Sequence, residues 1–163
     1  DWAPQLQRMI DLRNTLGLRS PIHSLARLLN PLNARLGLQS IFHPGYQGVH
    51  RDASGLLGDT VIVVKGDGGE IEINPDSPSH LYGTTAGESW DEEWPALSAQ
   101  RHVKPATLEP EHLKALWRGE VEDSYPQLAL IATMALALRG LGHSREHAFV
   151  VAQQYWDARN KSI

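Results

Sequence analysis

Apolar residues recur at helical spacing in the first thirty positions of the chain. The first run follows Pro4, which suits the opening turn of a helix, and it stops at Gly17, which suits a helix end. A second run starts at Ser20-Pro21, a helix cap followed by proline at the first helical position, and it reaches Pro31. The pattern therefore predicts two consecutive helices.

A strand, a helix and a second strand are predicted next. Residues 36–42 form a short strand candidate, and residues 44–57 form a helix candidate that ends at Gly58. Residues 61–64 are consecutive β-branched apolar residues, which is typical of a strand buried on both faces. This order predicts a right-handed βαβ unit.

The remaining sequence is expected to begin with non-helical segments and to end with helices. Residues 66–69 are rich in glycine and predict a turn, residues 70–73 alternate as a half-exposed strand does, and residues 76–100 show no regular pattern. Further helices are expected over residues 108–117, from residue 125 to near Gly140, and from the N-cap Ser144 onward.

These elements predict a single α/β domain over residues 1–163. We expect strand 61–64 to lie inside its sheet, between helices 45–57 and 126–140. No internal repeat or linker interrupts the pattern.

Composition narrows the class of protein. Apolar residues make up 41% and charged residues 21% of the 163 residues, as in a folded globular domain. No apolar run reaches the ~18 residues of a membrane helix, so no membrane partner is expected. The absence of cysteine excludes disulfides and thiol chemistry and suits a cytoplasmic location. Because the chain opens on Asp1 and not on methionine, we expect a fragment or a processed product.

Two short motifs have both a functional and a structural interpretation. His143 to His147 match the H-x-x-E-H zinc pattern, but Ser144 is the natural helix cap, so a capped surface helix is favoured. The glycine-rich segment 66–69 could hold a phosphate through backbone N–H groups, or could be a tight turn between strands.

Basic residues are enriched near the amino terminus although the net charge is −4. His23 and Arg27 are four positions apart and share a helix face. They could belong to a basic rim, or the helix face could simply be solvated. The other candidates for this rim are Arg13, Arg19, Arg35, His43, His50 and Arg51.

Residues 12–34, LRNTLGLRSPIHSLARLLNPLNA, resemble the signature of the anthranilate phosphoribosyltransferases, a branch of glycosyltransferase family 3. The coinciding positions include Arg13, Leu16-Gly17, Arg19, Leu25 and Asn30-Pro31. The resemblance continues through strand 61–64 and the WRGE segment at 117–120 into the helix near the end of the chain. It implies the carboxyl-terminal part of a nucleoside phosphorylase/phosphoribosyltransferase-type α/β domain, with a mainly parallel sheet flanked by helices.

The resemblance also implies roles for two residues. Arg13 would bind the carboxylate of the aromatic acceptor, because a guanidinium pairs with a carboxylate through two parallel hydrogen bonds. The family's Asp-Glu pair, which helps hold magnesium and phosphoribosyl pyrophosphate, falls on Ile71-Glu72. Only Glu72 remains as a candidate metal ligand, and Ile71 weakens the magnesium site.

Other departures point toward a relative that binds nucleic acid. Ile22-His23 and Ala26-Arg27 replace the family's Phe-Asn and Gly-Pro, and the segment 40–46 resembles the S-x-x-H-P-x-Y motif of the YbiB-like group. This group is similar in sequence to the transferases and binds nucleic acid. The residues expected to contact single-stranded or double-stranded nucleic acid are His23, Arg27, Arg35, His43 and Arg51.

The family's pyrophosphate loop and its helical dimerisation domain would lie upstream of these residues. We therefore expect an inactive carboxyl-terminal part of an anthranilate phosphoribosyltransferase-like protein and assign no catalytic residue. The parent, the longer protein to which this part would belong, would be a homodimer acting on phosphoribosyl pyrophosphate and an aromatic acceptor. The alternative is a non-catalytic nucleic-acid-binding protein with the same fold.

Overall fold

The structure is a computed structural model that describes residues 3–18, 20–66, 71–103 and 109–162. The chain divides into two compact units, Asp1–Ala34 and Arg35–Ile163. Each unit is described by itself.

The first unit is helical, as its sequence predicts. Helix α1 spans Pro4–Leu16 and ends at Gly17, whose φ of 67° lies in the left-handed region and whose N–H donates to Arg13 O at 2.9 Å. The second predicted helix is shorter than expected, because α2 (Ile22–Leu25) passes into a 3₁₀ turn, η1 (Ala26–Leu28). Leu29 is already extended ahead of Asn30 and Pro31.

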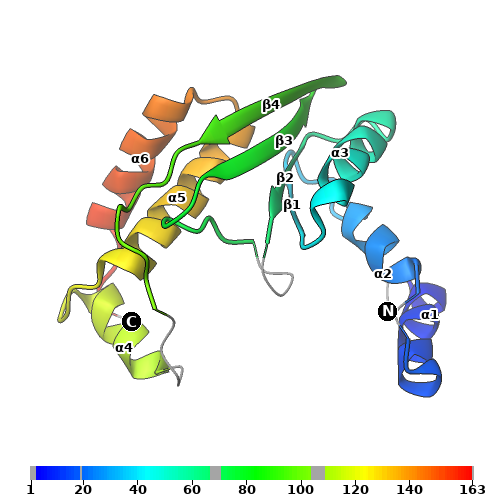
Figure 1. Cartoon of the computed structure of the whole chain (residues 1–163), viewed down its shortest axis with the longest axis horizontal. Coiled ribbons are helices and arrows are strands. Elements are labelled where there is room, and N and C mark those ends of the chain that lie inside the picture. The colour runs from blue at the N-terminus through cyan, green and yellow to red at the C-terminus, as the bar shows by residue number, and fades with distance from the viewer. Residues whose placement is uncertain (1–2, 19, 67–70, 104–108, 163) are drawn as a thin grey trace. The chain divides into compact units, whose positions relative to one another are not determined.

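The second unit is built on one four-stranded sheet in the order β1-β2-β3-β4 (Figure 1). The strands are β1 (Gly37–Ile41), β2 (Val61–Lys65), β3 (Ser79–Thr85) and β4 (Glu88–Trp94). Strands β1 and β2 run parallel, whereas β2 with β3 and β3 with β4 pair antiparallel. The expected mainly parallel sheet is therefore wrong for the described residues, and the fold is mixed α/β.

The antiparallel half of the sheet differs from two expectations drawn from the sequence. Ile71–Ile73 form no strand, and the segment expected to be irregular contains the β3–β4 hairpin. Its turn is Ala86-Gly87, with φ values of 53° and 83°, a two-residue turn without the usual Asn-Gly signal. The inward side chains of β4 alternate as Trp90, Glu92 and Trp94, so an acid interrupts the apolar pattern.

Helices cover both faces of the sheet. After a 3₁₀ turn, η2 (Pro44–Tyr46), helix α3 (Gln47–Leu56) completes the parallel βαβ unit on one face. Helices α5 (Ser124–Gly140) and α6 (Arg145–Asp157) cover the other face, and α4 (Pro110–Arg118) precedes them. The predicted helices near residues 45–57, 108–117 and 126–140, and the last helix, are confirmed.

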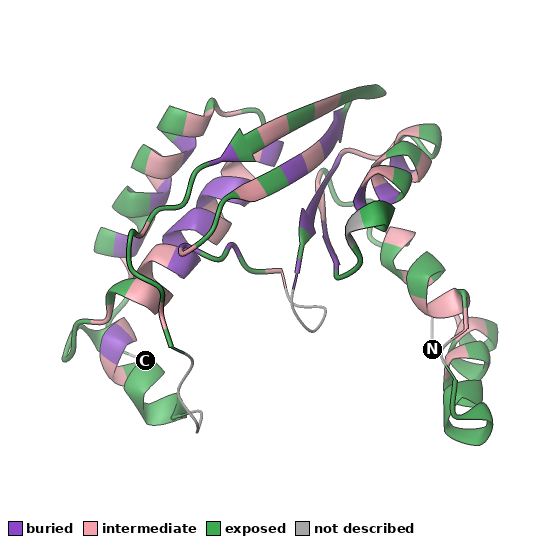
Figure 2. Ribbon diagram, viewed as in Figure 1, coloured by how far each residue is buried: buried purple, intermediate pink, exposed green. Residues whose placement is uncertain are grey.

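Strand β2 is the centre of the core, as predicted. Val61 to Val64 are at most 2% exposed, and Figure 2 shows buried residues concentrated on β2 and the inner face of α5. Ile62 and Val64 join the larger apolar cluster beneath α5 and α6, while Val61 and Val63 pack with Ile41 on the α3 side. The prediction of an interior strand is confirmed.

Gly83 of β3 provides a test of this packing. A Cβ added there would lie 2.1 Å from the Trp90 ring, its cross-strand partner, so Gly83→Ala must displace the indole. We expect Gly83→Ala to lower the free energy of unfolding by about 2 kcal/mol, as overpacking does. Urea denaturation followed by tryptophan fluorescence measures the change. Gly48→Ala is the matched control, because no atom lies within 4 Å of its added Cβ. Equal stability of the two variants would contradict the packing described.

Candidate functional site

The carboxyl ends of the two parallel strands lie side by side. Ile41 at the end of β1 pairs with Lys65 at the end of β2, and Gly66 N donates to Ile41 O at 3.4 Å. In α/β sheets, ligands bind beyond the carboxyl ends of parallel strands. Phe42 to Tyr46 leave β1 at this edge and lead into α3, so we name the segment the β1 exit loop.

The β1 exit loop presents aromatic rings to solvent. Phe42 is 57% and Tyr46 58% exposed. The imidazole of His43 lies between them, with ring centroids 5.2 Å from Phe42 and 6.3 Å from Tyr46, both in edge geometry. This is a cluster of three rings beside the end of β2.

Hydrogen bonds tie the loop to the sheet. Tyr46 N donates to His43 O at 3.1 Å, which closes the 3₁₀ turn. The buried side chain of Gln47 donates from Nε2 to Ile41 O at 3.4 Å, connecting the first residue of α3 to the last residue of β1. Hydrogen bonds within the protein therefore help to shape the loop.

Lys65 adds a cation to this edge. Val61, Val63 and Ile41 share the α3 face, and alternation along β2 directs Lys65 to the same face. Lys65 is exposed, unlike the four residues that precede it in the strand. An ammonium group and an imidazole at adjacent strand ends can both donate hydrogen bonds to an anion.

A buried polar network holds α3 against β1. Gln39 Nε2 donates to Ser54 Oγ at 3.1 Å, and Gln39 Oε1 lies 3.2 Å from His50 Nδ1. Since His50 is only 6% exposed, it is part of the packing and does not contribute to the expected basic rim. Sequence pattern alone placed His50 on the rim because it could not show which helix face meets the sheet.

Arg51 is also engaged within the fold. Its guanidinium contacts Asp52 at 2.8 Å and Asp91 of β4 at 2.5 Å, and it lies over the ring of Tyr82. Hydrogen bonding to Asp52 and then to Asp91 raises the pKa of Arg51 above its usual value. The carboxylates of Asp52 and Asp91 thus balance the positive charge of Arg51, a residue that the sequence analysis expected to contact nucleic acid.

The other candidate residues come from both units of the chain. Arg13, His23 and Arg27 belong to the first unit, where Arg13 and Arg27 are exposed and the Nδ1 atom of His23 is 3.2 Å from Ser20 N. In the second unit, Arg35 is exposed before β1 whereas His43 follows it, so the strand separates them. Arg19 and most of the glycine-rich segment lie outside the described residues.

The residues that would replace the family's acid pair differ in environment. Glu72 is exposed, whereas Ile71 packs against the larger core cluster. Across the described parts of the chain, no group of three or more His, Asp or Glu side chains could hold a metal ion. An apolar side chain that packs against the core supplies no oxygen ligand, whereas the exposed carboxylate of Glu72 can still offer one.

The H-x-x-E-H motif forms a helix start. Ser144 Oγ accepts from His147 N at 3.3 Å, so the predicted cap is confirmed. The rings of His143 and His147 stack with centroids 5.0 Å apart. Residues 142–146 border an open surface cavity of about 480 Å³, where Arg139 pairs with Glu92 and Arg145 with Glu146.

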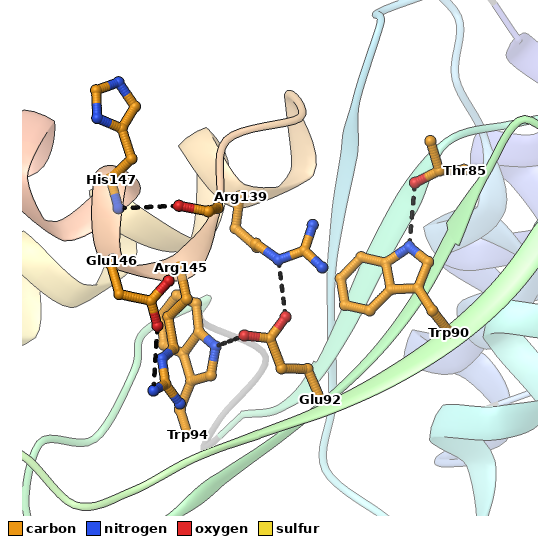
Figure 3. Close-up of polar contacts among 9 residues, drawn as sticks. Thr85, Trp90, Glu92, Trp94, Arg139, Arg145, Glu146 and His147 are labelled. Atoms are coloured by element: carbon orange, nitrogen blue, oxygen red, sulfur yellow. Dashed lines mark hydrogen bonds and ion pairs between the residues drawn. The ribbon is translucent and has the colours of Figure 1, made fainter.

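Beside this cavity, Glu92 connects the sheet to α5 (Figure 3). Its Oε1 accepts from Trp94 Nε1 at 2.9 Å and its Oε2 accepts from Arg139 Nε at 2.7 Å. The Arg139 guanidinium in turn lies 4.4 Å from the centroid of the Trp90 ring. Both carboxylate oxygens therefore have partners, and Glu92 links the indole of Trp94 to α5.

Sequence comparison finds relatives that each match less than half of the chain. No family model matches the chain. An uncharacterized protein of Aquifex aeolicus (strain VF5) is 36% identical over 80 residues, covering 48% of this chain and 26% of that protein. An anthranilate phosphoribosyltransferase of Polynucleobacter necessarius subsp. necessarius (strain STIR1) is 32% identical over 77 residues, covering 47% and 23%.

A third similar protein is uncharacterized protein YbiB of Escherichia coli (strain K12), 30% identical over 76 residues, with 45% of this chain and 24% of that protein covered. The chain spans about a quarter of the length of these curated relatives. The comparisons support a family-level resemblance to anthranilate phosphoribosyltransferase and YbiB, and a related fold. Among the described residues, no helix is long and apolar enough to span a membrane.

The contacts of Glu92 generate a prediction about stability. Glu92→Gln removes the charge that pairs with Arg139 but keeps an oxygen for the Trp94 indole, so we expect a loss of about 1–3 kcal/mol in the free energy of unfolding. Glu93→Gln is the matched control, because this exposed neighbour points to the opposite face of β4. Thermal unfolding followed by circular dichroism compares the two. A loss of stability in Glu93→Gln as large as in Glu92→Gln would show that the contacts of Glu92 are unimportant.

Proposed function

We propose that this chain is the carboxyl-terminal part of an anthranilate phosphoribosyltransferase-like protein of glycosyltransferase family 3. We further propose that it has no transferase activity of its own and that the edge formed by the β1 exit loop and Lys65 binds nucleic acid. The observation that carries the proposal is this edge, where three rings and a lysine lie at the ends of the parallel strands. Exposed aromatic rings and cations are what a nucleic-acid surface needs for bases and phosphates.

The environment of Ile71 supports the absence of transferase chemistry. A phosphoribosyl transfer needs the leaving pyrophosphate neutralised and positioned, usually with a divalent cation. Here the position of one expected carboxylate belongs to an isoleucine that packs into the core, and only Glu72 remains exposed. Magnesium prefers several oxygen ligands, so a single exposed carboxylate holds it weakly.

The charges of the chain limit its affinity for nucleic acid. The net charge is −4, and the guanidinium of Arg51 is paired with two carboxylates. Lys65 and His43 lie at the edge and can contact phosphates. Few phosphate contacts give weak binding that weakens further as salt rises.

A second function is proposed for the parent. Arg13 is exposed at the last turn of α1, where its guanidinium is accessible to the carboxylate of an aromatic acceptor. Together with Glu72 and with upstream parts that supply a pyrophosphate loop and a dimer interface, it would belong to a phosphoribosyltransferase. This alternative predicts that Arg13→Ala in the parent abolishes acceptor binding, while nucleic-acid binding by the edge predicts no such effect.

The first test concerns catalysis. We expect the purified 163-residue chain to release no pyrophosphate from phosphoribosyl pyrophosphate in the presence of anthranilate and magnesium, because Ile71 supplies no oxygen ligand for magnesium and leaves the single carboxylate of Glu72. A fluorescence assay for phosphoribosylated anthranilate and a pyrophosphate assay measure the reaction. A heat-denatured sample gives the background, and turnover above that background would refute the proposal.

The second test concerns binding. We expect the chain to bind labelled DNA at low salt and to release it as salt rises, and Lys65→Glu to weaken binding to every sequence alike, since phosphate contacts carry no base information. The logarithmic salt slope should fall by about one for the lost contact. Fluorescence anisotropy measures both quantities.

Lys161→Glu is the matched control for charge, because this exposed lysine lies near the carboxyl terminus and outside the edge. Equal weakening by both variants would indicate a general charge effect, and the absence of binding by the wild-type chain at low salt would refute nucleic-acid binding.

A further inference from the structure

We infer that the β1 exit loop stacks the bases of single-stranded nucleic acid, so that unpaired strands and not duplexes are its substrate. The inference rests on the proposed nucleic-acid function and assigns the aromatic rings of that same edge. It names Phe42 and Tyr46 as the residues that contact bases, and Lys65 as the residue that contacts the backbone.

Ring geometry is the first support. The contacts that His43 makes with Phe42 and Tyr46 are edge contacts, with interplanar angles of 83° and 62°. An edge contact covers at most one face of a ring, and both outer rings are more than half exposed. Each therefore retains a flat surface on which a base can stack.

The second support is that hydrogen bonds within the protein fix the backbone that carries the rings. The 3₁₀ turn is closed by the bond from Tyr46 N to His43 O, and Gln47 fastens the start of α3 to Ile41. Ordering a loop normally subtracts from affinity, and a loop already shaped by its own hydrogen bonds avoids that loss. Burying the two exposed apolar rings against a base also removes them from water.

The charge at this edge and the accessibility of the bases both favour single strands over duplexes. Lys65 lies on the α3 face of the same edge, where an ammonium can contact the phosphates that connect stacked bases. Bases in a duplex are already stacked on one another, and extracting one costs a few kcal/mol. A surface that offers ring faces and few cations gains from unpaired bases and gains little from a duplex backbone.

The experiment compares three labelled probes of about 12 nucleotides, a length within the site sizes of aromatic single-strand binders. They are oligothymidine, a duplex, and an abasic strand that keeps the backbone without bases. The full 163-residue chain is titrated at low salt with Phe42→Leu, Tyr46→Leu and the double variant. Leucine keeps apolar bulk and removes the ring, and circular dichroism verifies that each variant is folded.

We expect the double variant to bind oligothymidine about tenfold more weakly, and to bind the abasic strand and the duplex as the wild type does. Tyr46→Trp should retain binding because it keeps a ring. Tyr155→Leu is the matched control, since Tyr155 is 60% exposed on α6 and lies outside the loop. Its affinity should not change.

Two results would overturn the inference. In the first, Lys65→Glu weakens binding to all three probes, while the ring variants weaken binding to all three equally or to none. Nucleic-acid binding then stands and base stacking is wrong. If the wild type binds no probe at low salt, the proposed function and this inference both fail.

Discussion

The burial of strand β2 on both faces is the constraint on which the second unit depends. All four side chains from Val61 to Val64 are buried, so other elements must cover both faces of the sheet. Helix α5 provides one cover with small residues, Ala132 and Ala135, that are fully buried against it. Helix α3 provides the other, and its connection brings the carboxyl ends of β1 and β2 to the same edge.

Polar contacts fix the positions of these covers. Gln39 joins Ser54 and His50 beneath α3, while Glu92 joins the Trp94 indole to Arg139 of α5. Apolar packing alone is non-directional, whereas a hydrogen bond in a buried site loses most of its value when its geometry changes. Each cover is thus attached by at least one side chain whose partners lie on a different element.

The same contacts decide which charges are available for function. Arg51 and Arg139 are placed in ion pairs with acids of β4, and His50 is enclosed, so three of the basic residues in the chain serve the fold. What remains at the ends of the parallel strands is a lysine and a cluster of rings. Under the proposed function, this balance would favour stacking on bases over attraction by charge, and Ile71, which packs against the core cluster, would supply no oxygen ligand to magnesium.

The sequence by itself determined the local elements whose signals are strong and short-range. The run of β-branched residues specified β2, and the Ser144 cap specified the start of α6, because such preferences act within a few residues. The resemblance carried by residues 12–34 was also readable in this way, and comparison supports it at the family level.

Only the tertiary structure decided the antiparallel half of the sheet and the roles of the polar residues. The β3–β4 hairpin has an Ala-Gly turn and an inward Glu92, so its strands carry weak local signals and are stabilised by pairing and by Arg139. Whether a basic residue is buried, paired or exposed depends on what packs against it from distant positions. Arg51 and Lys65 have equivalent charges in the sequence, but an acid of β4 lies beside the first, while the second is exposed at the end of its strand.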